Sequence, residues 1–227
     1  MSDAVSDLPA GAHRGLHDVA RLLARWVFRP AFRIRMRGSE RVPRTGPIVL
    51  VANHTSMVEP QLLFGLLPRR SVFLVKEEMF HGPVGRGLEL IGQLPVRRGE
   101  PDRTPLLHAV RLLRSGGMVG VFPEGTRGSG DVKVAELGAA WLVRSSGAIV
   151  QPVAVRGTRR PAGTRRRFRP TVDVYFGEPF ALDVPRGRAG LADATEQLRV
   201  RLADTVAELD TWRATHGGSE RTRDVRQ

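Results

Sequence analysis

Cysteine is absent from this chain of 227 residues. Disulfide bonds, metal sites built on thiolates and acyl intermediates carried on a cysteine are therefore excluded. Long apolar runs are also absent, and the N-terminal stretch MSDAVSDLPAG carries no apolar segment of the kind found in a secretory signal. From these absences we expect a cytoplasmic protein that is neither secreted nor polytopic.

Lysine is scarce as well, since it occurs only at Lys76 and Lys133, and arginine supplies nearly all of the positive charge. Lys and Arg together number 36 against 23 Asp and Glu, a net charge of +13. Such an excess indicates attraction to nucleic acid, an anionic membrane or a phosphorylated small molecule, although a compositional preference for arginine explains part of it. Aromatic residues make up 6%, and the arginine-rich segment 159–169 holds only Phe168, so we expect no nucleic-acid binding.

The length of the chain fits a single domain. From Ile48 to Phe176, short β-branched runs alternate with amphipathic segments. This pattern predicts an α/β fold, with a mixed, mostly parallel central sheet flanked by helices. The expected strands are 48–52, 71–75, 93–96, 118–122, 149–155 and 172–176. The expected helices are 59–67, 84–91, 104–115, 134–146 and 191–215.

Composition divides the chain into a disordered tail at 1–12, an amphipathic helix at 13–37, the main domain at 38–216 and a second disordered tail at 217–227. In the helix, apolar residues recur at helical spacing and arginines recur every fourth position on another face. The two sets are Leu16, Val19, Ala20, Leu23, Trp26 and Val27, and Arg21, Arg25 and Arg29. The segment is too short and too charged to span a bilayer, so we favour a helix that lies on an anionic membrane surface. The alternative is a helix packed on the protein's own core with its arginines facing water.

His54 stands in the run VANHTSMVEP (51–60), where a predicted strand ends and a helix begins. Ligands bind at strand ends in α/β sheets. A neutral imidazole there can remove a proton from a hydroxyl if a carboxylate holds its other nitrogen, and Glu59 is the nearby carboxylate. Taken alone, such a pair more often satisfies the hydrogen bonds of a loop. Ser56 is expected to cap the helix rather than to act as a nucleophile.

A second run, VGVFPEGTR (119–127), again passes from a predicted strand into a turn. Gly125 permits a backbone conformation that other residues avoid, and Arg127 presents a planar guanidinium that matches phosphate oxygens. Read alone, Pro-Glu-Gly-Thr indicates only a turn. Its functional meaning depends on the rest of the chain.

Taken together and in this order, the two runs resemble the glycerolipid acyltransferase family, which includes the 1-acylglycerol-3-phosphate acyltransferases. Two further blocks agree with that family, GQLPVRR (92–98) and IVQPVAV (149–155), as does Lys76 followed by Met79-Phe80. The resemblance extends from about Val42 to Gly157. Any one block alone would be weak, and the ordered set carries the assignment.

The resemblance implies the fold of glycerol-3-phosphate acyltransferases and a single-step transfer from an acyl thioester, on coenzyme A or acyl carrier protein, to the free hydroxyl of lysophosphatidic acid. The product would be phosphatidic acid. It implies His54 as the base and Glu59 as the residue that orients it. The residues implied in substrate binding are Lys76, Arg97, Arg98, Glu124, Gly125, Thr126 and Arg127.

We expect no cofactor and no metal. The lack of a secretory signal and the amphipathic helix together predict a location on the cytoplasmic face of the cell membrane, with the anionic membrane surface as a partner. The resemblance adds the lysolipid and the acyl donor, on coenzyme A or acyl carrier protein, as further partners. Two alternatives remain open. The acceptor could be another lysophospholipid or an amino-acid-derived lipid, or the chain could be a non-catalytic lipid-binding relative.

Two positions depart from the family's pattern. Glu59 stands where the family usually has aspartate, and its extra methylene requires a backbone shift if the contact with His54 is kept. The segment VAELG (134–138) lacks the aromatic-lysine pair that usually precedes this glycine, although Lys133 is near. The second departure bears on the acceptor headgroup more than on the reaction.

Overall fold

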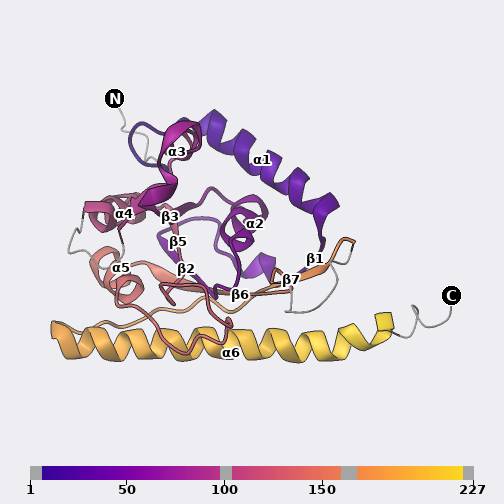
Figure 1. Ribbon diagram of the computed structural model, residues 1–227. Helices are drawn as coiled ribbons and strands as arrows, with labels where there is room; N and C mark the ends of the chain where they lie inside the picture. Colours follow the sequence, from indigo (N-terminus) through magenta and orange to yellow (C-terminus); the bar gives the residue numbers. More distant parts are fainter. Residues whose placement is uncertain (1–6, 98–103, 160–167, 222–227) are drawn as a thin grey trace.

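The computed structural model describes residues 7–97, 104–159 and 168–221 (Figure 1). Its α-helices are α1 Arg14–Ala31, α2 Val58–Leu66, α3 Gly82–Leu90, α4 Thr104–Arg114, α5 Gly138–Ser146 and α6 Gly187–Arg221. Two 3₁₀ turns are η1 Ser39–Arg41 and η2 Glu77–Met79. Its strands are β1 Arg33–Arg37, β2 Ile48–Ala52, β3 Val72–Lys76, β4 Leu94–Val96, β5 Met118–Val121, β6 Ile149–Arg156 and β7 Thr171–Phe176.

The strands form one 7-stranded sheet in the order β1-β7-β6-β2-β5-β3-β4. Strand pairs from β6 across to β4 are all parallel, whereas β7 pairs with β6 antiparallel and carries β1 parallel to itself. The predicted α/β fold with a mostly parallel sheet is therefore confirmed. The six predicted strands and five predicted helices are all present, with boundaries that differ by a few residues.

Two hydrophobic cores cover the two faces of the sheet. Successive side chains of a strand point to opposite faces, so Val49 and Val51 of β2 enter one core while Ile48, Leu50 and Ala52 enter the other. Helices α4, α5 and α6 close the first core, and α1 and α2 close the second (Figure 1). Because both faces are covered, β2 reads as an unbroken apolar run rather than an alternating one.

The segment 13–37 is only partly helical, which corrects the prediction. Helix α1 ends at Ala31, just after Pro30, and the chain turns into β1, which pairs with β7 along Arg33–Arg37. The alternation RIRMR suits an extended strand, and pairing with β7 supplies the backbone hydrogen bonds of that strand. In this strand the Arg35 side chain also donates to the buried carboxylate of Asp173 at 2.6 Å.

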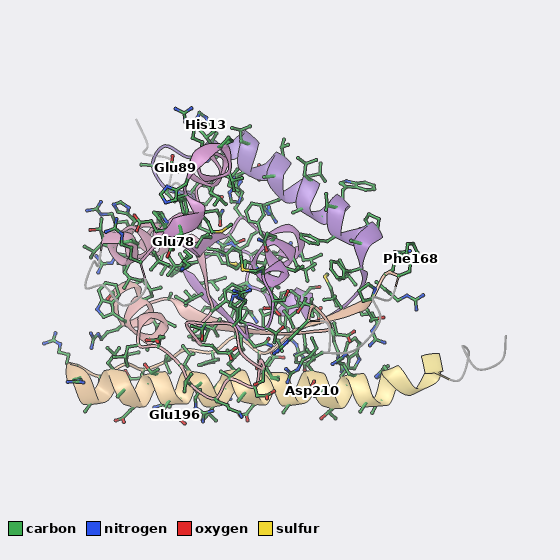
Figure 2. The ribbon with its side chains drawn as sticks, viewed as in Figure 1. His13, Glu78, Glu89, Phe168, Glu196 and Asp210 are labelled. Atoms are coloured by element: carbon green, nitrogen blue, oxygen red, sulfur yellow. The ribbon has the colours of Figure 1, made fainter. Side chains whose placement is uncertain are left out.

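The two tails were predicted to be disordered, and the structure corrects part of each. Residues 7–12 lie on the protein, where Leu8 is buried in the first core and Asp7 pairs with Arg70. The chain then enters α1 beside α3, since the backbone nitrogen of His13 donates to the carbonyl of Leu90 (Figure 2). At the other end, α6 continues to Arg221 as one helix.

Helix α1 packs closely on α2 and leaves its other side open. Ala20, Ala24 and Phe28 face the second core, and Gly65 of α2 permits the close approach. Arg21, predicted to lie on a stripe facing lipid headgroups, instead donates to the carbonyl oxygens of Phe64 and Leu67. The exposed large apolar residues of α1 are Leu16, Val19, Leu22, Leu23, Trp26 and Val27. Among the described residues, no helix is both long and apolar enough to cross a membrane.

Candidate active site

The C-terminal ends of β2, β5, β3 and β4 share one edge of the sheet, because these neighbouring strands are parallel. His54 follows β2, Glu124 follows β5, Lys76 ends β3 and Arg97 follows β4. This is the edge at which open α/β sheets bind ligands. With neighbouring strands about 4.8 Å apart, Lys76 lies roughly 10 Å and Arg97 roughly 14 Å along the edge from the strand that precedes His54.

The imidazole of His54 and the carboxylate of Glu59 are in direct contact. Nδ1 of His54 lies 2.9 Å from Oε2 of Glu59, so the extra methylene of glutamate does not prevent the expected pairing. When Nδ1 carries the proton and donates it to this carboxylate, Nε2 keeps the lone pair needed to accept another proton. The ring of Phe122 packs on the imidazole with 4.4 Å between centroids, which fixes the plane of the ring.

The carboxylate of Glu59 is fully buried and receives several hydrogen bonds. Oε2 accepts from the backbone nitrogens of Thr55 and Ser56 at 2.8 and 3.2 Å, in addition to His54. Oε1 accepts from the hydroxyls of Thr55 and Thr158. Burial by itself raises the pKa of Glu59, but the hydrogen bonds from His54, Thr158 and Thr55 outweigh it and hold the pKa below the ordinary 4.5. The site therefore keeps Glu59 ionised.

Glu124 supports the backbone of His54. Its Oε1 accepts from the His54 backbone nitrogen at 2.7 Å, and the carbonyl of His54 in turn accepts from the backbone nitrogen of Gly128 at 2.9 Å. Burial raises the pKa of Glu124, while the hydrogen bond from His54 lowers it in part. Gly125 has φ 68°, the left-handed conformation that glycine adopts without strain. The turn after β5 is thus clamped onto the loop after β2.

The cationic residues predicted to bind substrate lie at the same edge but are exposed. Thr126 and Arg127 stand on the turn after β5, next to Glu124. Lys76 pairs with Glu78 at 2.6 Å. Arg97 forms an ion pair with Glu77. Arg98 lies outside the described residues.

This arrangement combines a base and a cationic surface. The ionised Glu59 can stabilise a protonated imidazole, so His54 can take a proton from a hydroxyl that approaches Nε2. Arginine side chains along the edge suit an anionic group on the molecule that carries this hydroxyl. The chemistry is that of activating an alcohol for attack on an electrophilic carbon.

A model of the family described as Acyltransferase matches residues 33–156 of this chain. The chain belongs to that family. Both runs that carry the site, 51–60 and 119–127, fall within the match. The assignment to the acyltransferase family made from the sequence is therefore confirmed.

Relatives within the acyltransferase family carry a consistent description. The 1-acyl-sn-glycerol-3-phosphate acyltransferase of Bacillus subtilis (strain 168) is 29% identical over 185 residues, which cover 78% of this chain and 90% of that protein. The chloroplastic 1-acyl-sn-glycerol-3-phosphate acyltransferase LPAT1 of Arabidopsis thaliana is 30% identical over 155 residues, 65% of this chain and 43% of that protein.

A solved structure shares the fold. The crystal structure of the 1-acyl-sn-glycerophosphate (LPA) acyltransferase PlsC from Thermotoga maritima aligns with a TM-score of 0.65 and 25% identity, covering 86% of this chain and 79% of that one. The acyltransferase fold thus extends over most of the chain, beyond the residues that the family model matches.

Three residues of this candidate site were not singled out from the sequence. Asn53 binds both backbone groups of Val155 on β6, at 3.0 and 2.7 Å. Thr55 and Thr158 donate to Glu59. Asn53 and Thr55 flank His54 in the sequence, and this proximity to the predicted base could have identified them as site residues. Thr158 lies 99 residues from Glu59, and nothing local in the sequence connects the two.

The loop after the Glu124 turn is fixed by a cluster of charges. Arg156, the last residue of β6, pairs with Asp131 at 3.0 Å and with Asp210 of α6, labelled in Figure 2, at 2.8 Å. Its guanidinium also donates to the carbonyl of Ser129. These contacts join the candidate site to the long C-terminal helix.

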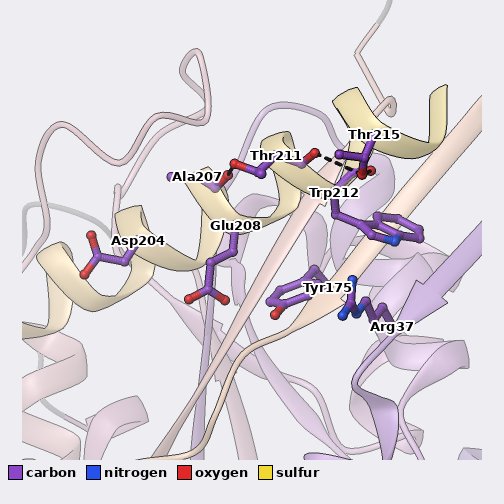
Figure 3. A pocket seen from close by; sticks show the side chains of 8 residues that line it. All are labelled: Arg37, Tyr175, Asp204, Ala207, Glu208, Thr211, Trp212 and Thr215. Atoms are coloured by element: carbon purple, nitrogen blue, oxygen red, sulfur yellow. Dashed lines mark hydrogen bonds between the residues drawn. The ribbon is translucent and has the colours of Figure 1, made fainter. Parts of the chain in front are cut away.

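A pocket of about 550 Å³ lies elsewhere, between α6 and the β1 edge of the sheet (Figure 3). It is lined by Arg37, Tyr175, Asp204, Ala207, Glu208, Thr211, Trp212 and Thr215. None of these lining residues belongs to the predicted site, since β1 is three places from β2 in the sheet. Over 7–97, 104–159 and 168–221, no cluster of His, Asp and Glu could hold a metal ion.

Proposed function

We propose that this chain transfers a fatty acyl group from an acyl thioester to the free hydroxyl of 1-acyl-sn-glycerol-3-phosphate, giving phosphatidic acid. The observation that carries the proposal is the buried His54–Glu59 pair, 2.9 Å apart, at the sheet edge that also holds the exposed arginines. The descriptions of the Bacillus and Thermotoga relatives support the choice of substrate.

The mechanism follows from the orientation of His54. Nε2 removes the proton of the acceptor hydroxyl while the hydroxyl oxygen attacks the thioester carbonyl carbon, and Glu59 stabilises the resulting imidazolium. The tetrahedral intermediate collapses with cleavage of the carbon–sulfur bond. The departing thiolate takes the proton from His54, which returns the base to its neutral form. The acyl group passes directly to the acceptor, so a covalent acyl-enzyme is not needed.

Acceptor binding is assigned to the cationic side chains at the edge. Arg127 lies three residues from Glu124, which holds the His54 backbone, so a phosphate bound by Arg127 would lie near the base. Lys76, Arg97 and Arg98 would add positive charge farther along the same edge. The phosphate monoester of lysophosphatidic acid carries more negative charge than a diester, which suits several arginines.

The enzyme is proposed to work at the cytoplasmic face of the cell membrane, resting on helix α1. Six large apolar side chains of this helix are exposed, and Trp26 reaches 66% exposure. Exposed apolar residues in contiguous patches mark interaction surfaces, and arginines flank this one. The acceptor and the product both reside in the membrane, so the location fits the reaction.

Product analysis by mass spectrometry tests the reaction. The purified chain, given lysophosphatidic acid and either acyl-coenzyme A or acyl carrier protein thioester, is expected to form phosphatidic acid. His54→Ala should abolish turnover, whereas His108→Ala, at an exposed position on α4, should not. Undiminished turnover by His54→Ala would refute the mechanism.

Acceptor choice is tested by comparing lysolipids with and without a phosphate monoester. Arg127→Ala is expected to raise KM for lysophosphatidic acid and to leave kcat largely intact. Equal rates on both kinds of acceptor would refute the phosphate role of Arg127. Tight lysolipid binding without thioester consumption would instead identify a lipid-binding protein.

A further inference from the structure

Glu59 must be held at both carboxylate oxygens to present one of them to His54. Oε2 meets Nδ1 of His54 and the backbone nitrogens of Thr55 and Ser56. A glutamate side chain has three rotatable bonds, so these contacts alone leave the carboxylate plane free to tilt. The tilt is limited at Oε1, which accepts from two hydroxyls, those of Thr55 and Thr158.

The two hydroxyls come from different parts of the fold. Thr55 is the neighbour of His54 in the chain and shifts with it. Thr158 stands two residues beyond the end of β6, a strand that pairs in parallel with β2, and its hydroxyl lies 2.6 Å from Oε1. Asn53 ties the His54 loop to β6 through both backbone groups of Val155. Thr158 therefore comes from the segment that follows β6 and not from the His54 loop.

We propose that Thr158 is a positioning residue for acyl transfer: its hydroxyl fixes the carboxylate of Glu59 in the orientation that aligns the imidazole of His54. The proposal rests on the proposed function of the His54–Glu59 pair. Thr158 touches neither substrate in this scheme and acts through Glu59, whose Oε1 it shares with the Thr55 hydroxyl 3.1 Å away. Its loss should slow the chemical step and leave the binding of both substrates unchanged.

Thr158→Val tests the proposal, because valine keeps the shape of threonine and removes the hydroxyl. We expect kcat to fall about tenfold, the effect of losing one hydrogen bond to a charged group, with KM unchanged for acceptor and donor. Thr158→Ser keeps the hydroxyl and should restore most of kcat. Thr211→Val makes the same change on α6, where the threonine hydroxyl bonds only its own helix, and should keep the parent kcat. A Thr158→Val enzyme with the parent kcat would overturn the proposal, as would a Thr158→Ser enzyme as slow as the valine variant.

A double substitution tests whether Thr158 acts through Glu59. Glu59→Asp withdraws the carboxylate by one methylene, out of reach of the Thr158 hydroxyl. In that background Thr158→Val should cost little further kcat, since the contact is already lost. A full additional loss in the double variant would show that Thr158 acts by another route. If Glu59→Asp is too slow to measure, the comparison of Thr158→Val with Thr158→Ser decides whether the hydroxyl positions Glu59.

A readout that needs no turnover separates this proposal from the proposed function. In the full chain labelled with ¹⁵N-histidine, the Nδ1 proton that His54 donates to Glu59 should resonate far downfield. Thr158→Val should move or broaden that resonance, and Thr211→Val should leave it in place. An unmoved resonance would overturn the positioning role. If the parent protein proves inactive but Thr158→Val still moves the resonance, the positioning role of Thr158 is upheld and the proposed acyl transfer is contradicted.

Discussion

At the scale of single residues, Glu124 has a clear physical role because its carboxylate is buried and accepts from the backbone nitrogen of His54 at 2.7 Å. Glu124→Ala leaves that nitrogen without its acceptor, which costs roughly 1–3 kcal/mol in a buried place and lets the loop move. We expect kcat to drop while KM for the acceptor changes little. Steady-state kinetics with a thermal unfolding scan measure both effects.

Glu124→Gln is the matched control, because its amide oxygen can still accept from the His54 nitrogen. This variant should keep most of the activity that the alanine variant loses. A rise in acceptor KM with unchanged kcat, in either variant, would instead assign Glu124 to headgroup binding, as the sequence resemblance implied.

Glu59 should also contribute to the pH dependence of stability. Its folded pKa lies below the ordinary 4.5, so the unfolded chain binds the proton more readily. The stabilisation is fully present above 4.5 and is lost as pH falls through the lower folded pKa. Glu59→Gln removes the titrating carboxylate and with it this pH-dependent stabilisation. Between about pH 6 and about pH 3, the unfolding free energy of Glu59→Gln should therefore fall less than that of the parent.

Chemical denaturation at several pH values measures this difference. Glu196→Gln is the comparison, since the pKa of Glu196 is also lowered, through its bond to Arg199, but the group is exposed. Replacing Glu196 should change the fall of the unfolding free energy at acid pH far less. Parallel profiles for the parent and Glu59→Gln would contradict the prediction.

Local spacing allowed the His54–Glu59 pair to be predicted, because five residues across a strand-to-helix junction let the two side chains meet. The contacts of Glu124 with His54 and of Thr158 with Glu59 span 70 and 99 residues. Such contacts depend on which strands become neighbours, and the sequence pattern does not encode that order. The contact between His54 and Glu59 was therefore predictable, but the residues that hold the pair were not.

At the scale of elements, the crossing of α1 over α2 depends on Gly65. A Cβ added there would lie 2.8 Å from the backbone nitrogen of Arg25 and 3.1 Å from the Cβ of Ala24. Backbone cannot yield as a side-chain end can, so Gly65→Ala should destabilise the fold by about 2 kcal/mol. Gly87→Ala on α3 meets nothing within 4 Å and should be neutral or stabilising by up to about 1 kcal/mol. Denaturant unfolding of the two variants provides the comparison, and a neutral Gly65→Ala would contradict this account of the crossing.

The strands that are buried on both faces of the sheet, and the helices between them, were easily predicted, whereas strand β1 was not. Strands such as β2 are continuous apolar runs, and the helices between them show a clear period. Strand β1 reads RIRMR at the edge of the sheet and follows directly from α1, so the helical period appeared to continue. What decides its conformation is pairing with β7 and the ion pair of Arg35 with Asp173, both contacts with distant residues.

At the scale of the whole molecule, charge and apolar surface should act together in membrane binding. The net charge of +13 attracts the chain to anionic lipid from a distance, and this attraction weakens as salt shortens the screening length from about 10 Å at 0.1 M to about 3 Å at 1 M. Insertion of the exposed face of α1 does not depend on salt in this way. Binding should therefore have a salt-sensitive and a salt-resistant part.

Vesicle sedimentation separates the two parts. Replacing Leu22 and Trp26 together by serine removes two apolar side chains of α1 that are 54% and 66% exposed, so the fold should keep its stability. At about 1.5 kcal/mol or more each, their loss should weaken binding roughly a hundredfold at high salt. Val200→Ser on α6, 41% exposed, is the control and should bind as the parent does. If the double variant still binds anionic vesicles as tightly as the parent at high salt, α1 is not the surface that enters the membrane, because charge alone cannot sustain binding once it is screened.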